Sequence, residues 1–516
     1  MKTSEIQYRE SIYKKWVLNP LGLDYDNSIV AWLLLFFAAI TTFLFYYLNG
    51  DVPVILLVLY LLTVSLLSFI KLDYSFILFI LAAMLFEQYP IPHFPAATEQ
   101  VRMFSNLKEI PYLPFFDAGV ISPMEIHLLA ILFSLFVMAG VHKKFTFRPI
   151  PVWGAYILFA GSMILSLAYG LMGGGDFLIS LWEVRALFYF LILYLVVPQI
   201  IRTRHHIQML LWVIIAGVAI KALQGVARFV DLGFTTGGFD VLTNHEDAVF
   251  IVALFILLLG LITFKADHSQ KKWLIILMPL LILGFYVAQR RATYASLIVS
   301  IAFFVVLLPT AMRLSFLKYF IPVCIVLTLY GFAFWNSDST IARPVQMIKS
   351  GIEKPDRYTN TRDYYSNLYR EFENYNLAQT VVNNPVTGTG FGKRYDQPIP
   401  LVEIRFSLRD YIPHNQIIWV LVKMGSVGFF AFWFFFNAFV AYGTRLINHM
   451  KDPYLRAVAT VIVISVINQM VVSYFDLQLT YYRNMLFLGC LMGLLPVIRH
   501  IESEKQIAEK EGEDER

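Results

Sequence analysis

The chain has few charged residues and almost no cysteine. Of its 516 residues 15% are charged, whereas soluble domains have about 25%. Two cysteines, Cys324 and Cys490, both within apolar segments, leave no room for a disulfide framework or a paired-cysteine metal site. The first 28 residues are polar and lack an apolar core followed by a cleavage site, so we expect no removable signal peptide.

Apolar residues, in contrast, are abundant and come in long segments. They make up 58% of the chain, and segments such as 29–48 reach the roughly 20 residues needed to cross a bilayer core. We therefore predict an all-α polytopic membrane protein with about 14 transmembrane helices. The predicted spans are 29–48, 53–70, 75–88, 123–141, 152–171, 184–201, 208–227, 248–264, 273–288, 293–312, 319–335, 416–441, 457–475 and 484–498.

The distribution of lysine and arginine predicts the orientation in the membrane. These residues gather in alternate loops, for example at Lys14 and Lys15, at Arg202 and Arg204, and after the predicted span 248–264. Short loops rich in Lys and Arg usually stay in the cytoplasm. Both termini fall on this side, so we predict a multi-pass protein of the bacterial cytoplasmic membrane with both termini inside.

The opposite face carries a loop, 336–415, that is too long for an ordinary connection. Its segment 361–382 has apolar residues at helical spacing, so the loop is expected to be partly helical. The predicted organisation is a cytoplasmic segment 1–28, a membrane domain 29–335 of about 11 helices, an outer loop domain 336–415, a membrane domain 416–498 of about 3 helices, and a charged cytoplasmic tail 499–516.

Arginines occur on the outer face, where the charge rule disfavours them. They are Arg185, Arg228, the doublet Arg290–Arg291, and Arg483. Lys221 precedes Arg228 by seven residues and shares its helix face. Charges near the membrane are costly, and the guanidinium fork matches phosphate oxygens. The group predicts an outward-facing site for a phosphate or pyrophosphate.

A structural role is the alternative for each of these arginines. They could reach lipid headgroups or pair with Asp176, Glu183 or Asp476. This alternative is favoured for Arg483, whereas the doublet in its short turn favours function.

A histidine lies at the end of the long loop. The sequence PHNQIIWVLVKMGSVG (413–428) places His414 and Asn415 where the loop enters a helix, and Gly425 and Gly428 follow. Histidine is a usable base near neutral pH. By itself, a His-Asn pair at a helix start is better explained by helix capping or hydrogen bonding.

The wider pattern resembles the O-antigen ligase/polymerase superfamily. It consists of the HN-x9-GxxG element, the preceding stretch NPVTGTGFG (384–392), the long outer loop, and the arginine turn in AQRRATYASL (288–297). The resemblance covers roughly residues 210–440 in organisation. Enzymes of this superfamily transfer glycans from undecaprenyl pyrophosphate at the outer face of the cytoplasmic membrane.

The resemblance implies roles for individual residues. His414 corresponds to the family's essential loop histidine, which would act on the acceptor hydroxyl. Arg291 matches the arginine of a Ser-Arg-small motif that would bind the donor pyrophosphate. Arg290 stands where the family has serine, so either arginine could take that role. Arg228 is the nearest candidate for a second family arginine, while Arg185 follows from the residues alone.

Several further residues have two readings. Tyr411 belongs to a tyrosine-rich loop that suits sugar contacts or a small core. Lys423 lies deep in the predicted span and either serves the site or pairs with a polar group such as Asn468. Glu371 and Glu373 are interpreted as solvated or arginine-paired, with carboxylate-dependent transfer as a minor alternative.

The implied function is metal-free glycosyl transfer without a cofactor. We predict a polymerase that joins undecaprenyl-pyrophosphate-linked oligosaccharide repeats of a surface or exported polysaccharide. The alternative within the family is a ligase that moves finished glycan to lipid A-core or another acceptor. The alternative outside it is a lipid-linked oligosaccharide flippase or exporter. Expected partners are the lipid-linked glycan, its acceptor, the phospholipid bilayer and other polysaccharide assembly proteins, but no nucleic acid.

Overall fold

The computed structural model describes residues 27–89, 91, 96–110, 120–141, 146–235, 242–337, 339–353, 357–358, 361–404 and 406–514. The predicted N-terminal segment 1–28 therefore lies almost entirely outside the described residues. Within them the chain is helical and has no strand, as the long apolar segments predict. The all-α prediction is confirmed.

Ten described helices are long and apolar enough to cross a membrane. Four shorter apolar helices accompany them, and each of the predicted spans overlaps one of these helices. The count of fourteen spans stays a prediction, because the shorter helices fall below the length of a full crossing. The ten are α3 (Val52–Ile70), α6 (Pro123–Val141), α7 (Trp153–Met172), α8 (Phe177–Ile200), α9 (Arg204–Asp231), α11 (Ser269–Ala288), α13 (Thr310–Phe334), α16 (Gln416–His449), α17 (Pro453–Phe475) and α18 (Tyr482–Asp514). The shorter ones are the stretch Phe36–Tyr47 of α2 (Asn27–Tyr47), and α4 (Leu72–Leu85), α10 (Asp247–Thr263) and α12 (Arg291–Leu307).

The chain forms two compact units. Unit 1 comprises Met1–Arg148 and Val196–Ile220, and unit 2 comprises Pro149–Leu195 and Lys221–Arg516. In unit 1, α3, α4 and α6 pack on one another and α2 packs on α3; the short helices α5 (Ala97–Gln100) and η2 (Leu107–Glu109) also belong to it. All the predicted site residues lie in unit 2.

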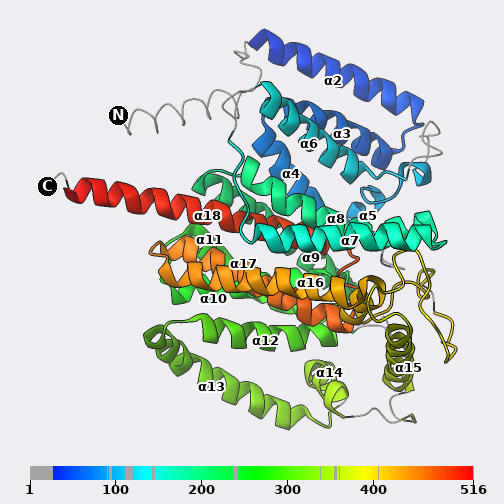
Figure 1. Cartoon of the computed structure of the whole chain (residues 1–516). Coiled ribbons are helices and arrows are strands. Elements are labelled where there is room, and N and C mark those ends of the chain that lie inside the picture. Colours follow the sequence, from blue (N-terminus) through cyan, green and yellow to red (C-terminus); the bar gives the residue numbers. More distant parts are fainter. Residues whose placement is uncertain are drawn as a thin grey trace. The chain divides into compact units, whose positions relative to one another are not determined.

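Helix α17 forms the core of unit 2. It packs against α10, α12, α16 and α18, and α16 also packs against α7 (Figure 1). Its sequence is mostly apolar, and residues around its whole circumference are buried. An evenly apolar helix is expected at the centre of a bundle.

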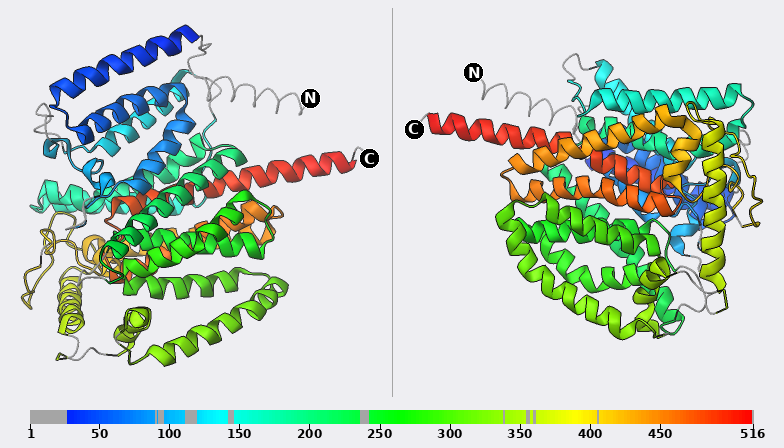
Figure 2. Two further views of the ribbon diagram at one scale, coloured as in Figure 1. Left: turned by 180° about the vertical axis from the view of Figure 1, so that it is seen from behind. Right: turned by 60° about the horizontal axis from the view of Figure 1, so that its bottom comes forward.

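The segment 336–415 adds three helices at one end of unit 2. These are η4 (Thr340–Ala342), α14 (Arg343–Ile352) and α15 (Thr361–Asn383). Helix α15 lies across the end of the long helices, close to the start of α16, and α14 lies near the start of α12 (Figures 1 and 2). The expected helix 361–382 is therefore present.

Helix α16 is broken at Gly425, whose backbone has φ 62° and ψ −172°. Backbone groups of the stretch 384–392 form hydrogen bonds with α16 on both sides of the break. The amide of Thr389 donates to the carbonyl of Val422 (2.8 Å), and the amide of Ser426 donates to the carbonyl of Pro385 (2.9 Å). The break thus leaves these polar groups satisfied, as an irregular backbone at membrane depth requires.

A buried ion pair holds the same region together. Lys423 lies 2.7 Å from Glu183 of α8, and both side chains are fully buried. Lys423 also donates to the carbonyl of Lys393, and the amide of Gly392 donates to Glu183. Of the two readings of Lys423, pairing is therefore correct, although the partner is Glu183 and not Asn468.

Candidate functional site

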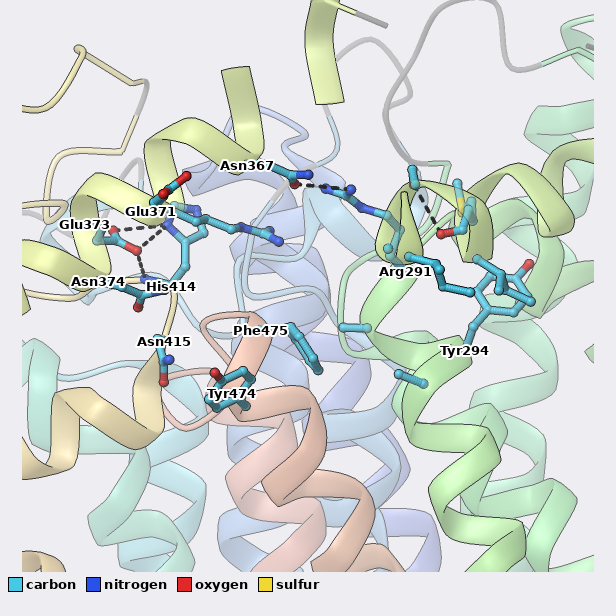
Figure 3. A pocket seen from close by; sticks show the side chains of 18 of the residues that line it. Arg291, Tyr294, Asn367, Glu371, Glu373, Asn374, His414, Asn415, Tyr474 and Phe475 are labelled. Carbon is cyan, nitrogen blue, oxygen red and sulfur yellow. Dashed lines mark hydrogen bonds and ion pairs between the residues drawn. The ribbon is translucent and has the colours of Figure 1, made fainter. Parts of the chain in front are cut away.

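A cavity of about 680 Å³ opens between the helix ends of unit 2. Its walls come from α12, α14, α15, the start of α16 and the end of α17 (Figure 3). The polar part contains a histidine, two arginines and two glutamates. These and the neighbouring amides are Arg291, Asn367, Arg370, Glu371, Glu373, Asn374, His414 and Asn415. The apolar part includes Ala292, Ala295, Ile298, Met347, Ile348, Ile352 and Phe475.

His414 lies on one wall and is held by Glu373. One carboxylate oxygen accepts the His414 backbone amide at 3.0 Å, and both oxygens lie 3.2 Å from its Nδ1. A carboxylate only accepts hydrogen bonds, so Nδ1 carries the proton. In the neutral ring Nε2 is then the acceptor. The side chain of His414 is 25% exposed, whereas that of Glu373 is buried.

Tyr369 packs against the same imidazole. The two ring centroids are 5.6 Å apart, with the planes at 81°. Burial, followed by the negative charge of Glu373, raises the pKa of Tyr369 to about 12. Tyr369 therefore remains a neutral phenol at neutral pH. His414, whose imidazole can accept a proton, is the candidate base on this wall.

Arg291 lies on the opposite wall (Figure 3). It is the first residue of α12, and its Nη1 donates to Oδ1 of Asn367 at 3.3 Å. The positive end of a helix dipole and a guanidinium both favour an anion. This wall can therefore hold a phosphate group facing His414.

Arg290 acts on a different group. It is the N-cap residue of α12 and is absent from the residues that line the cavity. Burial alone would raise the pKa of the Asp476 carboxyl, but the charges of His245, Arg290 and His414 hold that pKa well below its usual range. Asp476 also accepts from Nδ1 of His245 at 3.0 Å. The two adjacent arginines therefore act on different groups: Arg291 lines the cavity, whereas the charge of Arg290 acts on Asp476.

Asn415 and Tyr411 are close to His414 in sequence but differ in position. The Oδ1 of Asn415 accepts the amide of Ile418 at 3.1 Å, so Asn415 caps α16 while also lining the cavity. Capping was the reading expected from the His-Asn pair alone. Tyr411 does not line the cavity; its hydroxyl accepts from Nε of Arg394 at 3.2 Å.

Arg483 forms a buried ion-pair cluster away from the cavity lining. It is fully buried and contacts Glu246 at 3.2 Å and Asp247 at 2.9 Å. Of the structural roles favoured for Arg483, ion pairing is the one present, but its partners are two carboxylates of the stretch TNHEDA (243–248). Neither was among the partners predicted from the sequence.

The remaining basic residues of the predicted set also lie off the cavity lining. Arg228 donates to the carbonyl of Leu242 at 2.8 Å, and Lys221 donates to Gln224 at 2.8 Å. Arg185 lies over the ring of Trp182, 5.7 Å from its centroid, a cation–π geometry. The structure therefore places His414, Arg291 and Asn415 around one cavity. The other predicted site residues lie outside its lining; they are Arg290, Arg185, Arg228, Lys221 and Tyr411.

Glu373 is the residue that the sequence interpretation missed. The expectation that it is solvated or arginine-paired is wrong, because it is 1% exposed and bonded to His414. A signal was available: Tyr369 and Glu373 are four residues apart and share one face of the predicted helix. The pairing with His414, 41 residues away, needed the tertiary structure.

Comparison with known proteins is consistent with the sequence resemblance. Residues 276–433 match a family model described as O-Antigen ligase. The matched region contains Arg291, Glu373 and His414 together with the break at Gly425. No curated protein matches the chain. The resemblance to the O-antigen ligase/polymerase superfamily is thereby confirmed, and the match indicates a membrane-embedded, glycosyltransferase-like enzyme.

Proposed function

We propose that the protein polymerises undecaprenyl-pyrophosphate-linked oligosaccharide repeats at the outer face of the bacterial inner membrane. The observation that carries this proposal is one cavity with His414 on one wall and Arg291 at a helix N-terminus on the other. A base facing an anion site is what transfer from a pyrophosphate donor requires.

Arg291 is the group proposed to bind the donor pyrophosphate. Negative charge grows on the leaving pyrophosphate as the bond between the anomeric carbon and the phosphate oxygen breaks. A preorganised donor at such a position can contribute about 3 kcal/mol to the transition state. Ala292, Ala295 and Ile298 continue the cavity along α12, and their apolar surface suits the first part of a polyprenyl chain.

His414 is the group proposed to act on the acceptor. Its Nε2 takes the proton as the acceptor hydroxyl oxygen bonds to the anomeric carbon. Asn374 lines the same cavity, and its buried Oδ1 has no hydrogen-bond partner among the described residues. A buried acceptor atom of this kind is suited to a sugar hydroxyl. The proposed transfer uses no metal ion, so chelation with EDTA is expected to leave it unchanged.

The position of the cavity favours enzymatic transfer over transport. It lies at the start of α12 and α16 and the end of α17, whereas a transporter would line a central path at mid-membrane depth with ionisable groups. The buried pair Lys423–Glu183 is mutually satisfied. A ligase for lipid A-core or another acceptor remains the second candidate; the long segment 336–415 supports a site that also holds a growing glycan.

The decisive experiment is the glycan chain length in cells that carry His414→Ala at wild-type membrane abundance. Collapse to single repeat units is the result expected of a polymerase. Full-length glycan left on its lipid carrier would identify a ligase instead. His449→Ala, at the far and exposed end of α16, is the matched control and should retain wild-type chains. Wild-type chain length and attachment in the His414 variant would refute glycosyl transfer at this site.

A further inference from the structure

We propose that Glu373 is a positioning residue that fixes the ring orientation and tautomer of His414. This inference rests on the proposed function, because it concerns how the base is prepared for the acceptor hydroxyl. Nothing in the sequence pattern assigns Glu373 this role. In the structure it is the one carboxylate, among the described residues, that bonds to His414.

The attachment involves two parts of His414. The carboxylate accepts both the backbone amide at 3.0 Å and the side-chain Nδ1 at 3.2 Å. The first contact fixes the backbone just before α16, and the second fixes the imidazole. The proton is thereby held at Nδ1, so that Nε2 is the nitrogen left to take a proton.

The carboxylate is itself held firmly by α15. One turn before it, Tyr369 packs edge-on against the imidazole. Three residues after it, Asn376 exchanges two hydrogen bonds with the backbone of Ile399, at 2.7 and 3.0 Å. With an exposure of 1%, Glu373 has little freedom to turn away from His414. Rigid support of this kind keeps a reactive group in its productive geometry.

Burial also gives Glu373 an electrostatic effect on His414. A buried carboxylate favours the charged imidazolium that forms when His414 takes the acceptor's proton. Loss of the carboxylate should slow proton transfer from the acceptor to His414. Binding of the donor should be affected much less, because Arg291 lies on the opposite wall.

Asp363 provides a matched control. It lies ten residues before Glu373 on α15 and is absent from the residues that line the cavity. Replacing either residue by its amide removes one negative charge from the same helix. A general charge effect would change both variants alike, whereas positioning of His414 would change one.

The test compares purified full-length Glu373→Gln, Glu373→Asp and Asp363→Asn with the wild type. The probe is the lipid-linked glycan extracted from cells carrying His414→Ala. We expect Glu373→Gln to lower kcat at least about tenfold, with KM for the lipid-linked glycan within about twofold. Asp363→Asn should match the wild type, and Glu373→Asp should be intermediate.

Several results would overturn the inference. Equal kcat values for Glu373→Gln and Asp363→Asn would do so, as would a KM that changes as much as kcat. If Glu373→Gln does not fold, the Glu373→Asp variant decides, because wild-type kinetics there would show that the geometry is not needed. The proposed function fails separately: in that case the His414→Ala cells accumulate no lipid-linked glycan.

Discussion

At the scale of single residues, adjacent positions in the chain have different roles. Arg290 and Arg291 are consecutive, yet Arg291 lines the cavity and Arg290 interacts with Asp476. The start of α12 separates them, since Arg290 has extended backbone angles and Arg291 begins the helix. Sequence resemblance left the assignment of the pyrophosphate arginine open. The geometry supports Arg291.

This assignment predicts different effects for the two arginines. We expect Arg291→Ala to lower kcat about 100-fold or more, because a donor to the developing charge is lost. Arg291→Lys should recover part of the rate, since it keeps the charge but not the fork. Arg290→Ala should instead lower thermal stability by leaving Asp476 less well compensated. Transfer rates and melting temperatures of the purified variants measure both effects, and the opposite pattern would assign the phosphate to Arg290.

At the scale of secondary-structure elements, the break in α16 lies on the helix that follows His414. The stretch 384–392 replaces the missing helical hydrogen bonds, and Lys423 with Glu183 ties this region to α8. Removing one member of a buried ion pair typically costs about 3–5 kcal/mol. His414 lies just before α16, so the same contacts that hold the break also hold the helix that carries the base.

The break at Gly425 predicts a severe effect of a single methyl group. A Cβ at this residue would lie 2.1 Å from the carbonyl oxygen of Val386, and its φ of +62° disfavours other residues. We expect Gly425→Ala to destabilise the protein by at least about 1–3 kcal/mol. Gly161→Ala in α7 is the control, because a Cβ there meets nothing within 4 Å. Thermal unfolding in detergent compares the two; equal melting temperatures would contradict a structural role for the break.

At the scale of the whole molecule, the sidedness of the chain determines whether the cavity meets lipid-linked glycan. The charge distribution predicts that the segment 336–415 faces outward and that the loop between α10 and α11 is cytoplasmic. Apolar helices show that the protein is embedded in a membrane. They do not reveal which side is which.

Cysteine labelling tests the predicted orientation. In a Cys324→Ser background, Tyr358→Cys in the long loop should react with a membrane-impermeant maleimide added to cells with a permeabilised outer membrane. Asp267→Cys should react only after lysis. Both positions are exposed, and Cys490 is fully buried. The reverse labelling pattern would place the cavity in the cytoplasm and exclude transfer from the outer leaflet.

The sequence alone determined the fold class and predicted His414 and the arginine doublet as residues of the candidate site. Long apolar segments require helices, because a membrane provides no water for unpaired backbone groups. His414 and the doublet Arg290–Arg291 were recognisable because each belongs to a local pattern, the HN-x9-GxxG element and the arginine turn.

Tertiary structure decided which charges meet. Glu373 reaches His414 across 41 residues, and Glu183 reaches Lys423 from another helix. Arg483 finds Glu246 and Asp247 in the same way. Charge pairing depends on distances of a few ångströms between side chains, and helix periodicity indicates which face a residue occupies but not what lies opposite. The carboxylate partner of the proposed base is therefore evident only in the tertiary structure, where α15 packs against α16.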